Sequence, residues 1–328
     1  MASLKDIRMR IDSTKHTQQI TKAMKLVSAA KLRKAQHNIT NMRPYALTLK
    51  QVIGDIAATQ KVSHPLMTKK ENIKNVLLVV LTSDRGLCGG FNSNINKFAD
   101  RYIAENKGKF EKIDFIFIGK RGADYFLRKK IKSIENFTKL DKEISYDLAK
   151  HIAEKLIVKY EEGQYDEVRL IYNEFKSAIS QKVVCETLLP VEFETSSFDG
   201  SKFAADMIFD PAPEVIIEGL LKKNFNLQVY RAMSESVASE HGARMTAMEN
   251  SSNNARDMIA KLTLGYVKRA VADAFQVYIE RDYCIGCTLF GNTDVEPIVI
   301  GPVRIESRTD WLNYAVKQGQ LQQKHAPV

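Results

Sequence analysis

Residues 11–36 read IDSTKHTQQITKAMKLVSAAKLRKAQ and lie within a stretch, residues 1–43, that contains neither proline nor glycine. Most of these residues favour the α-helix. At about 100° per residue, the apolar side chains before residue 12 share one face and those after residue 19 share the opposite face: Leu4, Ile7 and Ile11, then Ile20, Ala23, Met24 and Val27. The stretch predicts one long helix that meets two environments in succession, with polar residues 13–19 at the crossover.

The charge of the chain is concentrated at this end. The 328 residues carry a net charge of +10, and residues 1–36 contain nine Lys or Arg against two Asp. A basic helix suits a nucleic acid, an anionic membrane or an acidic protein surface, and charge alone does not separate the three. We expect neither a signal peptide nor a membrane span, because no apolar segment of either type is present. Four scattered cysteines favour a reducing compartment over a disulfide framework.

The rest of the chain alternates between strand and helix patterns. The first helix is expected to reach about Gln60, with a bend at Pro44. Short apolar runs followed by glycine-containing loops and helical segments then predict an open sheet with helices on its faces, as in a Rossmann-like α/β domain. Asp210-Pro-Ala-Pro opens a second long helix. The expected organisation is an N-terminal shaft helix 1–60, a linker 61–75, an α/β domain 76–210, a C-terminal shaft helix 211–266 that could reach 281, and an atypical extension 267–328.

The two long helices are expected to form an antiparallel coiled coil, since a long amphipathic helix is poorly stable alone. Each contains one polar gap, centred near residue 16 and near residue 252. Aligning the gaps predicts three neighbouring pairs along the coil: Met24 with Arg244, Leu4 with Leu264, and Met1 with Val267.

Residues 84–90, Asp-Arg-Gly-Leu-Cys-Gly-Gly, follow a predicted strand and precede a predicted helix, where a phosphate-binding loop would lie. The spacing matches neither a P-loop nor a dinucleotide-binding loop. Glycines that permit a tight turn account for the pattern more simply. Cys88 has no evident neighbouring base, so we expect no catalytic thiol.

Metal and hydrolytic sites are not expected. His16 and His241 lack Cys, Asp or His neighbours at ligand spacing. The pair Cys284 and Cys287 lacks the second pair that a zinc ribbon needs. No cofactor is predicted.

Four blocks of this sequence resemble the gamma subunit of the F-type rotary ATP synthase in its bacterial form. They are ITKAMKLVSAAKLRKAQ at residues 20–36, SDRGLCGGFN at 83–92, YNEFKSAI at 172–179, and SESVASEHGARMTAM at 234–248. They occur in the order of the family and make the resemblance specific over residues 1–266.

The resemblance implies a non-catalytic central rotor shaft that couples transmembrane ion flow to ATP synthesis on beta subunits. It implies one copy per complex, and as partners the alpha and beta subunits, the epsilon subunit and the membrane c-ring, without nucleic acid. It also implies a peripheral location on the cytoplasmic face of the bacterial inner membrane. Contacts with the acidic lever segment of a beta subunit would come from six residues: Met24, Lys25, Asp84, Arg85, Cys88 and Arg244.

After Tyr266 the sequence departs from the family pattern. Residues 267–328 include Cys284, Cys287 and the single tryptophan, Trp311, and their charges balance. A reading-frame or gene-model error, a lineage-specific extension and a fusion all remain open explanations.

Two functions of other classes compete with the rotor. A nucleotide-binding enzyme would use the loop at Gly86–Gly90. A basic coiled-coil protein that binds nucleic acid would lose affinity steeply as salt rises.

Overall fold

The computed structural model describes residues 3–60, 64–68, 70, 72–138, 145–191, 211–279, 298–300 and 303–305. The chain divides into two compact units: residues 22–249 form one, and residues 1–21 with 250–328 form the other. Within the described residues, no helix combines the length and the apolar character that crossing a membrane requires.

Helix α1 spans Leu4–Gln60, and Pro44 lies inside it. Its inward side advances by alternating steps of three and four residues, which is the spacing of a helix packed along one stripe. Within residues 22–249 this stripe consists of Ser28, Leu32, Ala35, Ile39, Met42, Ala46, Leu49, Ile53 and Ile56. Ile20, Leu26 and Val27 lie off this stripe and are 61%, 68% and 58% exposed, whereas Ile11 is buried. The predicted change of face is therefore visible in the burial of α1.

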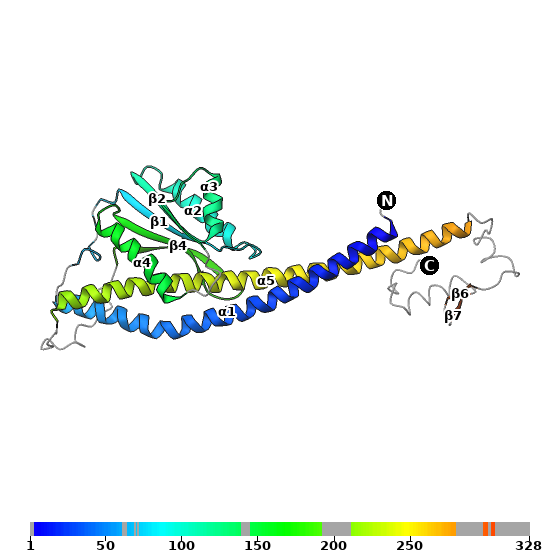
Figure 1. The fold of residues 1–328 in the computed structure, drawn as a ribbon, viewed down its shortest axis with the longest axis horizontal. Helices are drawn as coiled ribbons and strands as arrows, with labels where there is room; N and C mark the ends of the chain where they lie inside the picture. The colour runs from blue at the N-terminus through cyan, green and yellow to red at the C-terminus, as the bar shows by residue number, and fades with distance from the viewer. Residues whose placement is uncertain are drawn as a thin grey trace. The chain divides into compact units, whose positions relative to one another are not determined.

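A five-stranded sheet lies at the centre of the larger unit (Figure 1). Its order is β3-β2-β1-β4-β5; the first four strands are parallel, and β5 is antiparallel to β4. The strands are β1 (Asn75–Leu81), β2 (Lys112–Ile118), β3 (Glu135–Phe137), β4 (Glu167–Phe175) and β5 (Gln181–Leu189). Four of them fall where the apolar runs predict strands, whereas the three-residue β3 was not predicted.

Helices cover both faces of the sheet (Figure 1). Alternate residues of β1 point to opposite faces, as the pleat of a strand requires. Leu78 and Val80 join a core with α2 (Phe91–Glu105) and α3 (Lys120–Arg128). Leu77 and Val79 join a second core with α4 (Tyr146–Glu161), α1 and α5 (Pro213–Ile279). The two long helices are thus part of the core of the α/β domain.

Helix α5 is fixed to β4 and its hairpin by close contacts. Ser239 Oγ donates to the carbonyl of Asn173 at 3.1 Å. A Cβ at Gly242 would lie only 3.1 Å from the carbonyl oxygen of Ala178, so a side chain there would force the hairpin away. Glycine at this position lets the helix approach the hairpin backbone.

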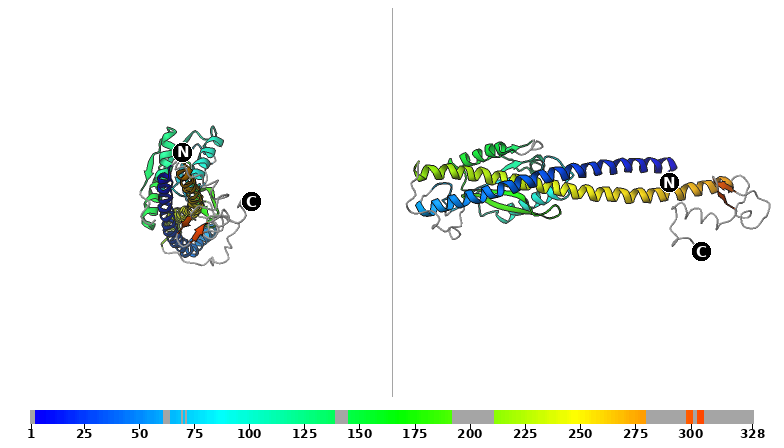
Figure 2. Two further views of the ribbon diagram at one scale, coloured as in Figure 1. Left: turned by 90° about the vertical axis from the view of Figure 1, so that its right-hand side faces the viewer. Right: turned by 90° about the horizontal axis from the view of Figure 1, so that it is seen from below.

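Within residues 22–249, α1 and α5 lie side by side (Figure 2). Leu32, Ala35 and Ile39 share a buried cluster with Ala238, and Lys25 Nζ lies 2.7 Å from Glu249 Oε1. The ion pair places Met24 opposite a position near residue 250. The predicted pairing of Met24 with Arg244 is therefore displaced by about six residues, or about 9 Å at 1.5 Å per residue. Polar gaps of six or seven residues define a register only to within one or two turns.

The smaller unit brings the ends of the two helices together. Gln18 Nε2 donates to the carbonyl of Ser252 at 3.5 Å, and Ile11 and Ala255 are buried. Leu264, which is predicted to lie beside Leu4, is 42% exposed. Helix α5 continues beyond Tyr266 to Ile279, and β6 (Ile298–Ile300) pairs with β7 (Val303–Ile305). Met1, Cys284, Cys287 and Trp311 lie outside the described residues.

Candidate functional site

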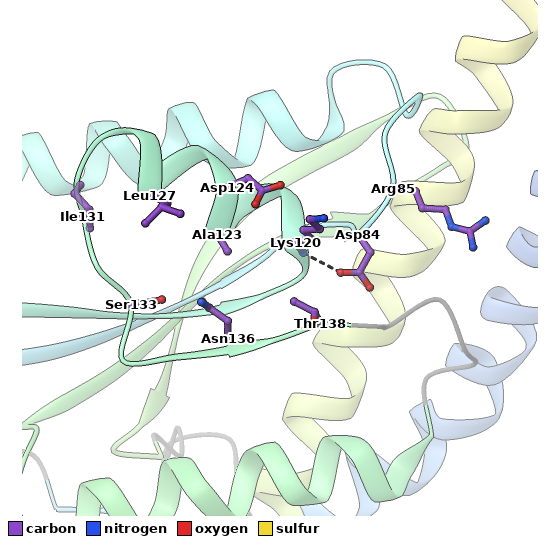
Figure 3. A pocket seen from close by; sticks show the side chains of 10 residues that line it. All are labelled: Asp84, Arg85, Lys120, Ala123, Asp124, Leu127, Ile131, Ser133, Asn136 and Thr138. Atoms are coloured by element: carbon purple, nitrogen blue, oxygen red, sulfur yellow. Dashed lines mark hydrogen bonds between the residues drawn. The ribbon is translucent and has the colours of Figure 1, made fainter.

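The loop between β1 and α2 carries three of the six predicted contact residues. Ser83 organises it: its backbone N–H donates to Asn92 Oδ1 at 3.0 Å, and its hydroxyl donates to the carbonyl of Arg85 at 2.5 Å. Asp84 Oδ1 accepts a 2.8 Å hydrogen bond from the backbone N–H of Lys120, at the start of α3 (Figure 3). A carboxylate already occupies this helix N-terminus, where it is favoured by the helix dipole. The loop is therefore not arranged to bind a phosphate there.

The tip of the loop has an unusual backbone. Leu87 has φ 62° and Gly89 has φ 55°, both in the left-handed region. This conformation is ordinary for glycine and strained for leucine. Leu87 is nevertheless 65% exposed, so core packing of its side chain does not explain the strain. Strained residues that the surrounding structure holds in place are a common feature of functional sites.

Cys88 is an internal residue of this loop. Its side chain is 2% exposed, and Asn92 Nδ2 donates to its sulfur at 3.1 Å. Burial raises the pKa of the Cys88 thiol, so the reactive thiolate is disfavoured. Cys88 therefore stabilises the loop from inside, and its sulfur is not presented to a partner.

Arg244 on α5 holds the loop in place through hydrogen bonds to its backbone. Its Nη2 lies 2.6 Å from Glu240 Oε1 and 3.2 Å from the carbonyl oxygen of Gly86, and its Nε lies 3.4 Å from the same oxygen. The guanidinium also meets His241 Nδ1 at 3.2 Å. Burial and the charge of Arg244 lower the pKa of His241 to about 4, so the ring is neutral at pH 7 and accepts this hydrogen bond. Arg244 itself is only 7% exposed.

The six predicted residues thus fall into two groups, and each group meets the same segment of α5. Arg244 joins Asp84, Arg85 and Cys88 through the loop, and a Cβ at Gly89 would lie 3.7 Å from Ala247 Cβ. Lys25 pairs with Glu249, five residues beyond Arg244, and Met24 beside it is half-buried. Arg85 is exposed, Met24, Lys25 and Asp84 are half-buried, and Arg244 and Cys88 are buried.

Sequence reasoning missed the partners of these residues. Glu240 and Glu249 hold Arg244 and Lys25, and Asn92 holds Ser83. The spacing of Glu240 and Arg244, four residues apart on a helix, is a signal that could have indicated their ion pair. The contact of Lys25 with Glu249 depends on the register between two helices and has no local signal.

Comparison with known proteins identifies the family. The family model described as ATP synthase matches residues 3–270. The ATP synthase gamma chain of Bdellovibrio bacteriovorus is 68% identical over 273 residues, which cover 82% of this chain and 92% of that relative. The chain belongs to the ATP synthase gamma chain family. The gamma chain of an Anaeromyxobacter species is 45% identical over 286 residues, covering 86% of this chain and 96% of that relative.

Solved structures agree with this membership in the family. The central stalk and c-ring structure of the Tetrahymena thermophila mitochondrial ATP synthase contains a chain with 29% identity and a TM-score of 0.55, covering 70% of this chain and 98% of that one. A chain of the Euglena gracilis mitochondrial ATP synthase rotor has the same fold, with a TM-score of 0.59 at 24% identity, covering 82% of this chain and 98% of that one. The chain is a non-catalytic subunit of ATP synthase and functions as its central rotor shaft.

Proposed function

We propose that α1 and α5 form an antiparallel coiled coil that turns inside a ring of alternating alpha and beta subunits. One copy would serve each complex, and the α/β domain would join the epsilon subunit and the c-ring. Rotation would couple transmembrane ion flow to ATP synthesis on the beta subunits. The complex would stand on the cytoplasmic face of the bacterial inner membrane, with this chain as a peripheral subunit.

The observation that supports a coupling contact is the arrangement around residues 244–249 of α5. Arg85 and Leu87 are exposed on a loop that buried groups hold in place, and Lys25 lies on the neighbouring helix at the same segment. Leu26 and Val27, exposed beside Lys25, add an apolar surface. We call Lys25, Leu26, Val27, Arg85 and Leu87 the coupling surface.

Its chemistry suits a surface that must slide. Exposed ion pairs contribute only about 0 to 1 kcal/mol, so an acidic beta segment could exchange one cation for the next at little cost. Lys25 already has an acidic partner in Glu249, and both side chains are more than a third exposed. An acidic segment of a beta subunit would then replace Glu249 at Lys25 and later release it.

Arg244, Asp84 and Cys88 have a different role in this proposal. Arg244 is too deeply buried to touch a partner and would act by positioning the Gly86 carbonyl. Asp84 would fix the loop to α3, and Cys88 would fill its interior. Met24, half-buried beside Lys25, would pack along the same segment.

Charge reversal tests the coupling role of Lys25. ATP synthase would be reconstituted with Lys25→Glu, with Glu249→Lys and with both changes, and proton pumping per ATP hydrolysed would be measured. We expect pumping to fall with Lys25→Glu and to stay low in the double variant, which restores the ion pair within the chain. Recovery in the double variant would show that Lys25 serves only its pairing with Glu249.

A matched control is Lys222→Glu, because Lys222 also pairs with a glutamate, Glu218, on an exposed surface. It should leave pumping unchanged.

Purification of the complex from membranes tests membership directly: this chain should be recovered with alpha and beta subunits, in one copy. Recovery of the chain without them would contradict the proposal.

A further inference from the structure

Helix α3 and strand β3 border a cavity of about 530 Å³ (Figure 3). It is lined by Asp84, Arg85, Lys120, Ala123, Asp124, Leu127, Ile131, Ser133, Asn136 and Thr138. Half of these residues are exposed, so the cavity opens onto the surface. Residues 120–138 contribute eight of the ten, and we call this region the α3–β3 surface.

The floor of the cavity is apolar. Ala123 and Leu127, four residues apart, lie along one side of α3, and Ile131, beyond the end of the helix, lines the same cavity. The core takes the other side, where Gly122 and Phe126 are buried. Leu127 remains 67% exposed, and Ile134 nearby is 45% exposed. Single exposed apolar side chains are ordinary, but a group of them along a cavity marks an interaction site.

The surroundings of the cavity are strongly basic. Residues 120–132 contain six Lys or Arg and one Asp. The dipole of α3 favours a cation such as Arg128 in its last turn. Lys130 and Lys132 lie beyond the end of the helix and are exposed, so the helix dipole accounts less well for the presence of cations at these two positions. Lys129 is neutralised by its pair with Asp100, but the other Lys and Arg side chains still give the surface a clear positive excess. A partner with negative charge is favoured.

The rim of the cavity includes an edge strand, which offers hydrogen-bonding groups. β3 ends the order β3-β2-β1-β4-β5 and, among the described strands, pairs with β2 alone; the cavity is lined by Asn136 within β3 and by Ser133 and Thr138 beside it. The outer side of an edge strand presents backbone N–H and C=O groups to which an extended segment can add. The carboxylates of Asp84 and Asp124 share the rim. They disfavour a phosphate group in the cavity, whereas an apolar side chain can pass between them.

From these features we infer that the α3–β3 surface binds an acidic, extended segment of another protein, which places one leucine-sized side chain in the cavity. The acidic residues of that segment lie over Lys130 and Lys132. Arg85 lines this cavity and also belongs to the coupling surface, whereas Leu127, Lys130 and Lys132 lie outside that surface. Binding of the segment does not depend on the proposed contact of Lys25 with a beta subunit.

Fluorescence anisotropy with the full-length chain tests the inference. The probe is a labelled peptide, Glu-Asp-Glu-Leu-Glu-Asp-Glu, and the comparison peptide has serine in place of leucine. We expect saturable binding of the leucine peptide, at least about 5-fold tighter than binding of the serine peptide, since leucine gains more than serine when its side chain leaves water. Leu127→Glu and the double variant Lys130→Glu with Lys132→Glu should each weaken binding by at least about 5-fold.

Matched variants distinguish this surface from general effects. Leu47 on α1 is 70% exposed, so Leu47→Glu makes the same chemical change elsewhere. Lys107→Glu with Lys109→Glu makes the same charge change at exposed positions that do not line the cavity. Both controls should bind the leucine peptide as the unmodified chain does. Leu127→Ser provides a milder change, and far-UV circular dichroism confirms that each variant is folded.

Three results would overturn the inference. Equal binding of the leucine and serine peptides would show that no side chain enters the cavity. Equal weakening by Leu127→Glu and Leu47→Glu would place the site elsewhere. Binding to phosphatidylglycerol vesicles without binding of either peptide would assign the cations to a membrane surface.

Discussion

Arg244 and Gly86 are 158 residues apart in the sequence, and the guanidinium of one donates to the carbonyl of the other, with Nη2 and O 3.2 Å apart. The contact joins α5 directly to the loop that carries Arg85 and Leu87. Because Arg244 is 7% exposed and also pairs with Glu240, it holds the loop from inside the molecule. Arg244 was expected to touch a beta subunit. It is better placed to position Arg85 and Leu87, which would make that contact.

Replacing Arg244 should therefore cost stability. Arg244→Ala would remove the buried guanidinium that pairs with the Glu240 carboxylate, whose side chain is 16% exposed, and we expect a loss of about 3 kcal/mol in the free energy of unfolding. Lys222→Ala on the same helix breaks an exposed pair with the same four-residue spacing, and should cost at most about 0.5 kcal/mol. Urea denaturation of both variants measures the difference. Equal losses would show that burial of the Arg244 pair is unimportant.

Gly119 should tolerate no side chain. It has φ 105°, and a Cβ there would lie 2.1 Å from the carbonyl oxygen of Thr82. Gly119→Ala should lower the free energy of unfolding by more than about 3 kcal/mol, since it combines backbone strain with overlap. Gly163→Ala is the control, because Gly163 has φ 72° but no atom within 4 Å of the added Cβ. Its cost should be about 1 kcal/mol, from backbone conformation alone. Thermal unfolding ranks the two variants.

Leu87→Gly should separate stability from function. Glycine adopts φ 62° without strain, and the lost side chain is mostly exposed. We expect the free energy of unfolding to be unchanged or to rise by up to about 1 kcal/mol. Proton pumping per ATP should fall if the coupling surface acts as proposed. A clear loss of stability would instead show that the Leu87 side chain contributes to folding.

The stability of the chain should depend on His241 in mild acid. The pKa of His241 in the folded chain is lowered to about 4, whereas an unperturbed histidine titrates near pH 6.5. Between these values the unfolded chain binds more protons, so the His241 contribution to stability falls as the pH drops from about 6.5 towards 4. His241→Gln should flatten the pH dependence of the melting temperature in this range. An unchanged slope would assign the dependence to other groups.

Most helices and strands could be predicted because their apolar residues recur with a clear period. Continuous apolar runs mark β1 and β2, and the absence of Pro and Gly before Pro44 marks the first part of α1. Strand β3 was missed since three residues, Glu-Asn-Phe, are too few to show a period. The strand exists because it pairs with the end of β2.

The sequence did not predict how exposed the residues of the candidate site are. The spacing of Glu240 and Arg244 is identical to that of Glu218 and Lys222, yet one pair is buried and the other is open. The difference comes from the loop at Gly86, which reaches α5 through the fold. No local sequence pattern in α5 predicts the contact between Arg244 and the Gly86 carbonyl. The register that pairs Lys25 with Glu249 is likewise set by packing along the whole of the two helices.

The enclosure of Cys88 has a practical consequence for optical experiments on rotation. Burial raises the thiol pKa of Cys88, and raises that of Cys185 to about 11, so maleimide reagents, which need a thiolate, should react slowly with both. Ile179, which is 83% exposed on the β4–β5 hairpin, offers an accessible position for an introduced cysteine. A dye or bead could therefore be attached at Ile179→Cys with the native thiols at positions 88 and 185 retained, in a chain in which Cys284 and Cys287 are replaced by serine.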